Sequence, residues 1–139
     1  MSDKTVWRGG DASAGFEVRI DRRRRILRFS FWGFWDITVG TAYRDGCIEA
    51  MKQISKSGPW CVLADISKYP AQKPDVQRCH ADTMVAGPTL GMKRAANLVD
   101  NTLSQMQIRR LSQESGIPAF SFFQDEATAL KWLADALAE

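Results

Sequence analysis

The sequence predicts a single α/β domain, in which helices pack on a mostly parallel sheet of about five strands. Strand-like and helix-like hydrophobic patterns alternate along the chain in the order ββαβαβαβα. Such alternation is typical of right-handed crossovers between parallel strands, with the opening hairpin as the antiparallel part. The chain has 139 residues, 45% of them hydrophobic and 25% charged, which is ordinary for one globular core.

The N-terminal segment is expected to be an arm followed by a hairpin. Residues 1–14 are polar and carry Gly9 and Gly10, so they are interpreted as a flexible arm. Apolar and polar residues then alternate over two segments that flank a run of arginines. A turn centred on Arg23 and Arg24 places the apolar pairs on one face, as Phe16–Phe31, Val18–Phe29 and Ile20–Leu27.

Helices and strands alternate after the hairpin, and capping residues mark several boundaries. In chain order we expect a helix at about 36–57 capped by Asp36, a strand at 60–66, a helix opened by Pro74 and ended by Gly87 and Pro88, a strand at 94–99, a helix at about 101–115, a strand at 119–123, and a last helix capped by Asp125. The expected buried stripes are Tyr43, Cys47, Ala50, Met51 and Ile54, then Leu103, Met106 and Leu111, then Leu130, Leu133, Ala134 and Leu137.

Four segments, taken in order, resemble a known family. They are an arginine- and phenylalanine-rich strand ending in FWGFWD, the strand WCVLADIS, the strand KRAANLVD and the closing FFQDEATALKWL. Together they resemble STAS-type domains, named from sulfate transporters and anti-sigma-factor antagonists, and especially the SpoIIAA-like branch of small bacterial proteins. The resemblance implies a STAS/SpoIIAA-like domain over residues 15–139. It also implies a regulatory role through binding rather than catalysis.

One segment departs from the pattern of this family. Classical antagonists carry a phosphorylatable serine in a loop after the central strand. The chain has Lys73, Pro74 and Asp75 where that serine would fall. We therefore expect no phosphoserine switch in the loop between Asp65 and Asp75.

The basic charge is concentrated near the N-terminus. Residues 1–30 hold eight Lys/Arg against four Asp/Glu, and the remainder holds eleven against twelve. The densest feature is the run Arg22, Arg23, Arg24 and Arg25, which is either a solvated hairpin tip that protects an edge or a site for an anionic partner. The run is short and no RNA- or DNA-binding motif accompanies it, so nucleic acid is not expected.

Six residues are candidates for binding a ligand or a partner: Trp32, Trp35, Asp65, Ser67, Tyr69 and His80. Asp65 and Ser67 lie at the carboxyl end of a predicted parallel strand, where α/β proteins often place ligands, although a cap or loop hydrogen bond is the favoured explanation of Asp65. The tryptophans either seal the space between helix and sheet or line a pocket or interface. His80 shares a helix face with Val76 and Met84, which favours a packed histidine.

Several kinds of function are not expected. The three cysteines are far apart, and Cys79 with His80 is the only adjacent pair of Cys or His side chains, so neither a metal nor a cofactor is predicted. His80 is the only histidine, so a catalytic triad has few candidates. The N-terminal residues lack an apolar signal segment, and no run is long enough to span a bilayer. A cytoplasmic location is expected.

Two functional hypotheses follow. The first is a non-enzymatic STAS-like module that acts through a protein partner or as a homo-oligomer. The second is a carrier or sensor of a small apolar or amphipathic ligand held near Trp32, Trp35, Tyr69 and the helix after Pro74. A pocket between helices would favour the carrier, and a flat aromatic patch would favour the partner module.

Overall fold

The computed structural model describes residues 4–99, 102–114 and 120–138. A few predicted positions lie outside this described part of the chain. They are residues 101 and 115 of the expected helix at 101–115, residue 119 of the expected strand at 119–123, and the Leu103 side chain. The elements are β1 (Val6–Gly10), β2 (Gly15–Asp21), β3 (Ile26–Trp32), α1 (Ile37–Ser55), β4 (Trp60–Lys68), α2 (Pro74–Thr89), β5 (Met92–Leu98), α3 (Thr102–Glu114), β6 (Phe120–Phe123) and α4 (Glu126–Leu137).

The strands form one sheet whose spatial order is the order of the chain, β1 to β6. β1, β2 and β3 pair antiparallel, while β3, β4, β5 and β6 pair parallel. The predicted hairpin register is confirmed, since Phe16, Val18 and Ile20 face Phe31, Phe29 and Leu27. The alternating apolar pattern of both strands selects this register, because a slip of one residue would expose every apolar side chain.

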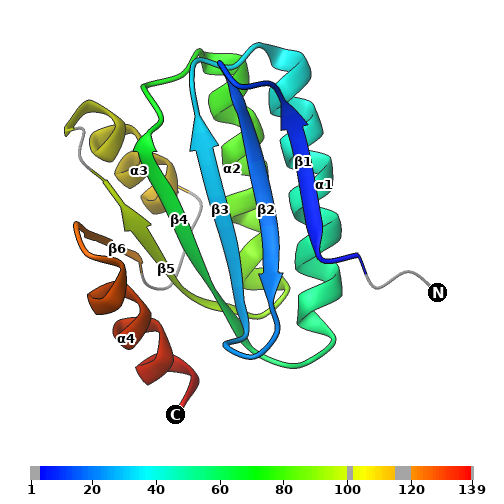
Figure 1. The fold of residues 1–139 in the computed structure, drawn as a ribbon, viewed down its shortest axis with the longest axis vertical. Helices are drawn as coiled ribbons and strands as arrows, with labels where there is room; N and C mark the ends of the chain where they lie inside the picture. Colours follow the sequence, from blue (N-terminus) through cyan, green and yellow to red (C-terminus); the bar gives the residue numbers. More distant parts are fainter. Residues whose placement is uncertain (1–3, 100–101, 115–119, 139) are drawn as a thin grey trace.

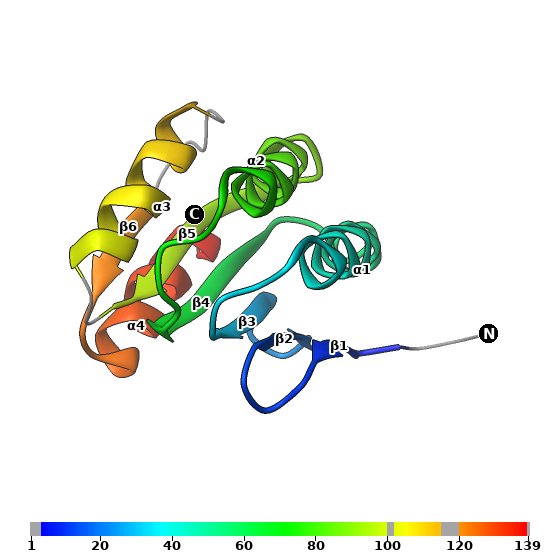
Figure 2. The same ribbon diagram turned by 90° about the horizontal axis from the view of Figure 1, so that it is seen from above.

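The helices cover the two faces of the sheet unequally. α1, α2 and α3 lie on one face, and α4 lies alone on the other, against β4 to β6 (Figures 1 and 2). Two separate apolar cores result: a large one between the sheet and α1 to α3, and a smaller one under α4. The outer face of β1 to β3 has no helix over it and carries charged side chains such as Arg8, Glu17 and Arg19.

The expectation that residues 1–14 form a flexible arm is wrong for Val6–Gly10, which form strand β1 and bring the sheet to six strands. Trp7 points into the large core and is 4% exposed. Gly9 lies opposite Phe16, and a side chain at Gly9 would collide with that ring. The glycines therefore make room for a neighbouring aromatic residue within a strand, whereas the sequence suggested mobility.

Asp36 and Asp125 cap their helices as expected and Pro74 opens α2, but Gly87 and Pro88 do not end α2, which continues to Thr89. Two buried helix faces also differ from the prediction. Asp36 accepts a hydrogen bond from the Val39 amide at 3.0 Å, and Asp125 accepts one from Thr128 at 2.9 Å. On α3, Leu111 is buried but Met106 is exposed. On α4, Leu133 is buried as predicted, but the other buried residues are Ala129 and Ala136. Leu130 and Leu137 are only half-buried, and Ala134 is exposed. α4 thus presents apolar surface beyond the part that enters the core.

Candidate functional site

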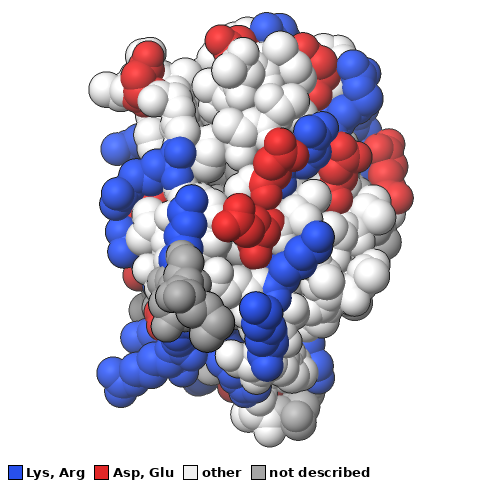
Figure 3. All heavy atoms as spheres, turned by 90° about the vertical axis from the view of Figure 1, so that its right-hand side faces the viewer, with Lys and Arg blue, Asp and Glu red and all other residues white. Residues whose placement is uncertain are grey.

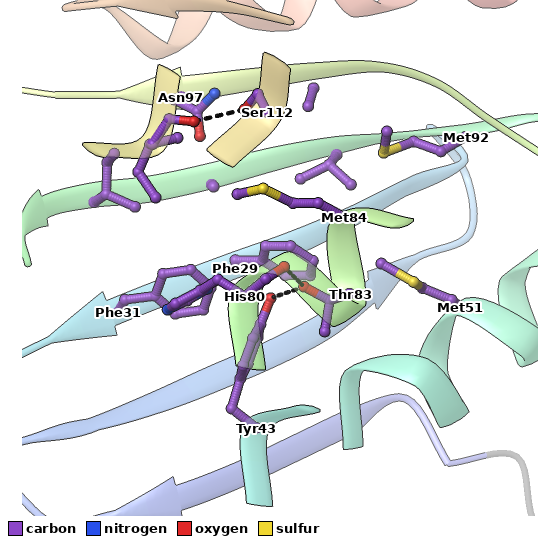
Figure 4. A pocket seen from close by; sticks show the side chains of 15 residues that line it. Phe29, Phe31, Tyr43, Met51, His80, Thr83, Met84, Met92, Asn97 and Ser112 are labelled. Atoms are coloured by element: carbon purple, nitrogen blue, oxygen red, sulfur yellow. Dashed lines mark hydrogen bonds between the residues drawn. The ribbon is translucent and has the colours of Figure 1, made fainter. Parts of the chain in front are cut away.

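A cavity lies inside the large core, between the sheet and the helices α1, α2 and α3 (Figure 4). The wider part of the cavity, which the centre of a water-sized sphere can occupy, measures about 40 Å³. Its walls are mainly aromatic and aliphatic: Phe29, Phe31, Tyr43, Met51, Val62, Ala64, Ile66, His80, Thr83, Met84, Met92, Ala95, Asn97, Ile108 and Ser112. The wider part has room for about two or three water molecules, so a larger guest requires side chains to move.

Polar groups meet at one side of the cavity. The Tyr43 hydroxyl lies 3.1 Å from Thr83 Oγ1, which donates to the His80 carbonyl at 2.9 Å. His80 Nε2 lies 2.7 Å from the Tyr69 hydroxyl. Burial lowers the pKa of His80 to about 3 and raises the pKa of Tyr43 well above its usual value. Both side chains are therefore neutral around pH 7.

Asn97 and Ser112 contribute polar groups from β5 and α3. Asn97 Nδ2 donates to the Ser121 carbonyl at a long 3.4 Å, and Ser112 Oγ donates to the Ile108 carbonyl at 2.8 Å. Neither residue was singled out from the sequence. A signal for Asn97 existed, because it is an amide within the otherwise apolar strand segment RAANLV.

Three methionines line the cavity from three elements: Met51 from α1, Met84 from α2 and Met92 from β5 (Figure 4). Unbranched thioether side chains change rotamer at little cost, so a wall built from them adapts to different guests. Met84 is partly exposed, whereas the other lining residues are buried. Met84 therefore covers the mouth of the cavity.

Three of the predicted site residues come together beside this cavity. Trp35 and His80 stack with ring centroids 5.3 Å apart, and Tyr69 packs against both rings. Trp35 is fully buried, and its indole N–H points to the carbonyls of Gly15 and Trp32, each at 3.1 Å. Trp35 and Tyr69 therefore support the wall, and of the three only His80 lines the cavity.

Gln72 is a buried residue that the sequence analysis missed. Its side-chain oxygen accepts a hydrogen bond from the Trp35 amide at 2.8 Å, and its side-chain nitrogen donates to the carbonyls of Gly33 and Pro70 at 3.0 and 2.8 Å. These bonds tie the loop before α2 to the entry of α1. They hold Trp35 and Tyr69 in place.

The other predicted residues lie on the opposite face of the sheet. Trp32, Asp65 and Lys68 border an open hollow of about 400 Å³, separate from the cavity. Asp65 accepts hydrogen bonds from the Ser67 amide at 3.0 Å and hydroxyl at 2.6 Å, and the Trp32 indole donates to the Asp11 carbonyl at 2.8 Å. Trp32, Trp35 and Tyr69 therefore do not form the single site that was expected. Alternation along β3 and β4 turns Trp32 and Asp65 to the opposite face, whereas Trp35 and Tyr69 lie in the loops after these strands and are buried in the large core.

The arginine run forms the turn between β2 and β3. Arg22, Arg23 and Arg24 are exposed, whereas Arg25 is half-buried and donates to the Leu137 carbonyl at 3.1 Å. Arg19 and Arg28 lie opposite each other on β2 and β3, but each forms an ion pair with an acidic residue. Arg19 lies 2.9 Å from Glu17, and Arg28 lies 2.7 Å from Glu126. Ion pairs thus offset the repulsion between these two arginines.

Reactive and metal-binding groups are sparse in the part of the chain that is described. All three cysteines are free thiols buried in the protein, as expected, and burial raises the pKa of Cys47 to about 12. No group of three or more His, Cys, Asp or Glu side chains is arranged to hold a metal ion among the described residues. In that same part, no helix is both long and apolar enough to cross a bilayer.

Comparison with protein families, with curated proteins and with solved structures finds no match to this chain.

Proposed function

We propose that this protein carries or senses a small, neutral, mainly apolar molecule bound in the cavity between the sheet and α1 to α3. The observation that carries the proposal is the wall itself, in which aromatic rings and three methionines surround a few hydroxyl and amide groups. Ligand pockets in proteins commonly combine an apolar wall with a small number of oriented polar groups.

The charge of the wall supports a neutral ligand. None of the lining residues is Lys, Arg, Asp or Glu, and His80 is uncharged because burial lowers its pKa to about 3. An ionised ligand would have to lose its hydration without gaining an opposite charge, which costs several kcal/mol. A ligand hydroxyl could instead bond to Thr83, Asn97 or Ser112, and a ligand carbonyl could accept a hydrogen bond from the Asn97 amide.

The experiment uses N-phenyl-1-naphthylamine, a neutral probe whose fluorescence rises in apolar surroundings. We expect saturable binding to the parent protein and a loss of at least about tenfold in affinity in Ser112→Leu, which fills the cavity from α3. The matched control is Gln113→Leu, the next residue on the same helix, which is exposed. Equal affinity in all three proteins, each shown to be folded by circular dichroism, would refute the proposal.

A second candidate is the STAS-like module that binds a protein partner, here a second copy of the chain. It is supported by Phe34 and Ile37, which are 55% and 42% exposed at the entry to α1. Lys73 Nζ lies 5.6 Å from the centre of the Phe34 ring. Neighbouring exposed apolar residues at the surface are a common feature of interfaces.

Sedimentation over a range of protein concentrations tests this candidate. Association by the parent chain and its loss in the double variant Phe34→Ser, Ile37→Ser would agree with an interface at this position. The control is Val85→Ser with Met106→Ser, because these residues are equally exposed and lie on other helices. If the control dissociates the chain as strongly, the entry to α1 is not the interface.

A further inference from the structure

The end of the molecule where β3 to β6 begin is basic. It brings together the arginine turn, the C-terminal ends of α1 and α4, and the first residues of β5 (Figure 1). The Cys61 amide donates to the Arg25 carbonyl at 3.0 Å, and Arg25 also bonds to Leu137, so the turn, β4 and α4 meet here. In the view of Figure 3, basic side chains gather at the lower end, whereas basic and acidic side chains are mixed over the middle and upper parts.

A groove of about 290 Å³ crosses this end, between the arginine turn and the last turns of α4. Its apolar side consists of Ile26, Leu130, Ala134, Leu137 and Ala138, and its rim consists of Arg23, Arg24 and Arg25. On this side of α4, Leu130 and Leu137 pack against the smaller core but stay half-buried, and Ala134 and Ala138 are exposed. The groove is on the α4 side of the sheet, opposite the cavity between α1 and α3.

The three rim arginines differ in how they are already engaged. Arg25 is fixed against α4 by its bond to Leu137, and Arg24 lies 3.6 Å from Asp21. Within the described residues, no ion pair involves Arg23, although it is exposed. Asp135, the acidic residue of this part of α4, is not among the groove's lining residues. The rim therefore keeps an unmatched guanidinium beside an apolar surface.

We infer that this groove binds a single anionic amphiphile, with an acyl chain along α4 and a phosphate or carboxylate head at Arg23. A guanidinium forms two parallel hydrogen bonds to such a head group, and the apolar floor takes the chain out of water. A groove with both an arginine and an apolar floor should bind an anionic amphiphile in preference to inorganic phosphate, which has no chain, and to a nucleic acid, which would leave the apolar floor exposed. The neutral ligand proposed for the cavity lacks the charged head group and is therefore a different molecule.

Decyl phosphate, kept below its micelle concentration, is the probe, and nuclear magnetic resonance of the labelled protein reports both affinity and position. We expect shifts that map to the turn and to α4, and weaker binding of inorganic phosphate and of 1-decanol by at least about tenfold each. Arg23→Glu should weaken binding of decyl phosphate by a similar factor. Lys56→Glu, the same charge change at the same end but outside the groove, should alter it less than about twofold.

Ala134→Trp provides a second test that leaves the charge unchanged. Ala134 is exposed, so a larger side chain there fills the groove without entering the core, and we expect it to abolish binding. The inference is overturned if Lys56→Glu matches Arg23→Glu, if inorganic phosphate binds as well as decyl phosphate, or if only anionic vesicles bind. It is also overturned if the shifts map to residues between α1 and α3, or if Ala134→Trp changes only self-association. The cavity proposal stands or falls separately, on the neutral probe.

Discussion

His80 shows how its surroundings set the chemistry of one residue. As the only histidine it is the natural first candidate for acid–base catalysis. It is instead packed among Phe31, Trp35 and Tyr43, and burial lowers its pKa to about 3. A base that is protonated only in strong acid is unsuited to proton transfer near neutral pH. Its contribution is a neutral, hydrogen-bonded wall for the cavity.

The same burial makes the stability of the fold sensitive to acid. In the unfolded chain His80 takes up a proton below about pH 6.5, but in the folded protein it does so only near pH 3. Stability is complete above the unfolded value and falls with pH by up to about 1.4 kcal/mol per unit between the two values. We expect His80→Gln to lose less stability than the parent between pH 6.5 and pH 4 in urea titrations.

Tyr69→Phe is the control, because it removes the hydroxyl next to His80 Nε2 and leaves the imidazole in place. Its stability should be lower at every pH but should fall with acid as in the parent. Parallel pH curves for the parent and His80→Gln would show that His80 titrates alike in the folded and unfolded chains.

At the scale of elements, strand β1 shows why local patterns fail at sheet edges. The segment VWRGG has a single large apolar residue and two adjacent glycines, so periodicity cannot identify it. What makes it a strand is β2, whose residues pair with it from Arg19 to Gly15. The longer elements were predictable because their hydrophobic patterns repeat over several helical turns or along the full length of two paired strands.

Trp7→Ala tests the importance of β1. Trp7 is buried against α1, where a Cβ at Gly46 would stand 3.4 Å from its ring. We expect a loss of about 3–5 kcal/mol in the free energy of unfolding, the usual cost of removing a buried tryptophan. Arg8→Ala changes the next residue, on the exposed face, and should cost less than about 1 kcal/mol. A small effect at Trp7, measured by urea titration, would mean that the strand is dispensable.

The β2–β3 turn is centred on Arg23 and Arg24, as predicted, but its backbone differs from that of the commonest two-residue hairpin turn. A turn centred on Arg23 and Arg24 suggests Asn-Gly there, but among the four turn residues only Arg25 has a positive φ, of 56°. We expect Arg25→Ala to be less stable than Arg25→Gly by about 1 kcal/mol, because both lose the bond to Leu137 and only glycine relieves the left-handed backbone. Equal unfolding midpoints for the two variants would show that the backbone at this position carries no strain.

At the scale of the whole molecule, the fold class was predictable and the cavity was not. Alternation of strands and helices determines which elements form, and parallel pairing of β4, β5 and β6 follows from the crossovers. The cavity depends on how far apart three helices stand and on which rotamers Met51, Met84 and Met92 adopt. Those distances are set by packing between segments remote in sequence, and periodicity has no information about them. His80 and Asn97 were the recognisable signs of polar groups in that space.

Hydrogen exchange should reflect the position of each strand in the sheet. β3 and β4 have a strand on both sides and apolar cores beneath, whereas β1 and β6 are edge strands. We expect amides of β3 and β4 to exchange only through global unfolding, and those of β1 and β6 to exchange faster through local opening. Exchange of β4 as fast as that of β6 would contradict a single cooperative sheet.

The order of the sheet also bears on how the chain folds while it is being synthesised. Since each strand pairs with the strand that precedes it in the chain, every newly emerged segment finds its neighbour already made. No strand must wait for a later one or be inserted between two others, so assembly can proceed vectorially from the ribosome. Helix α4 is the one element that completes a core late in this order. The surface that it covers, formed by Ile26, Cys61, Leu63 and Ala96, stays exposed until α4 has been synthesised. A nascent chain stalled before residue 126 would therefore leave that apolar surface exposed to solvent.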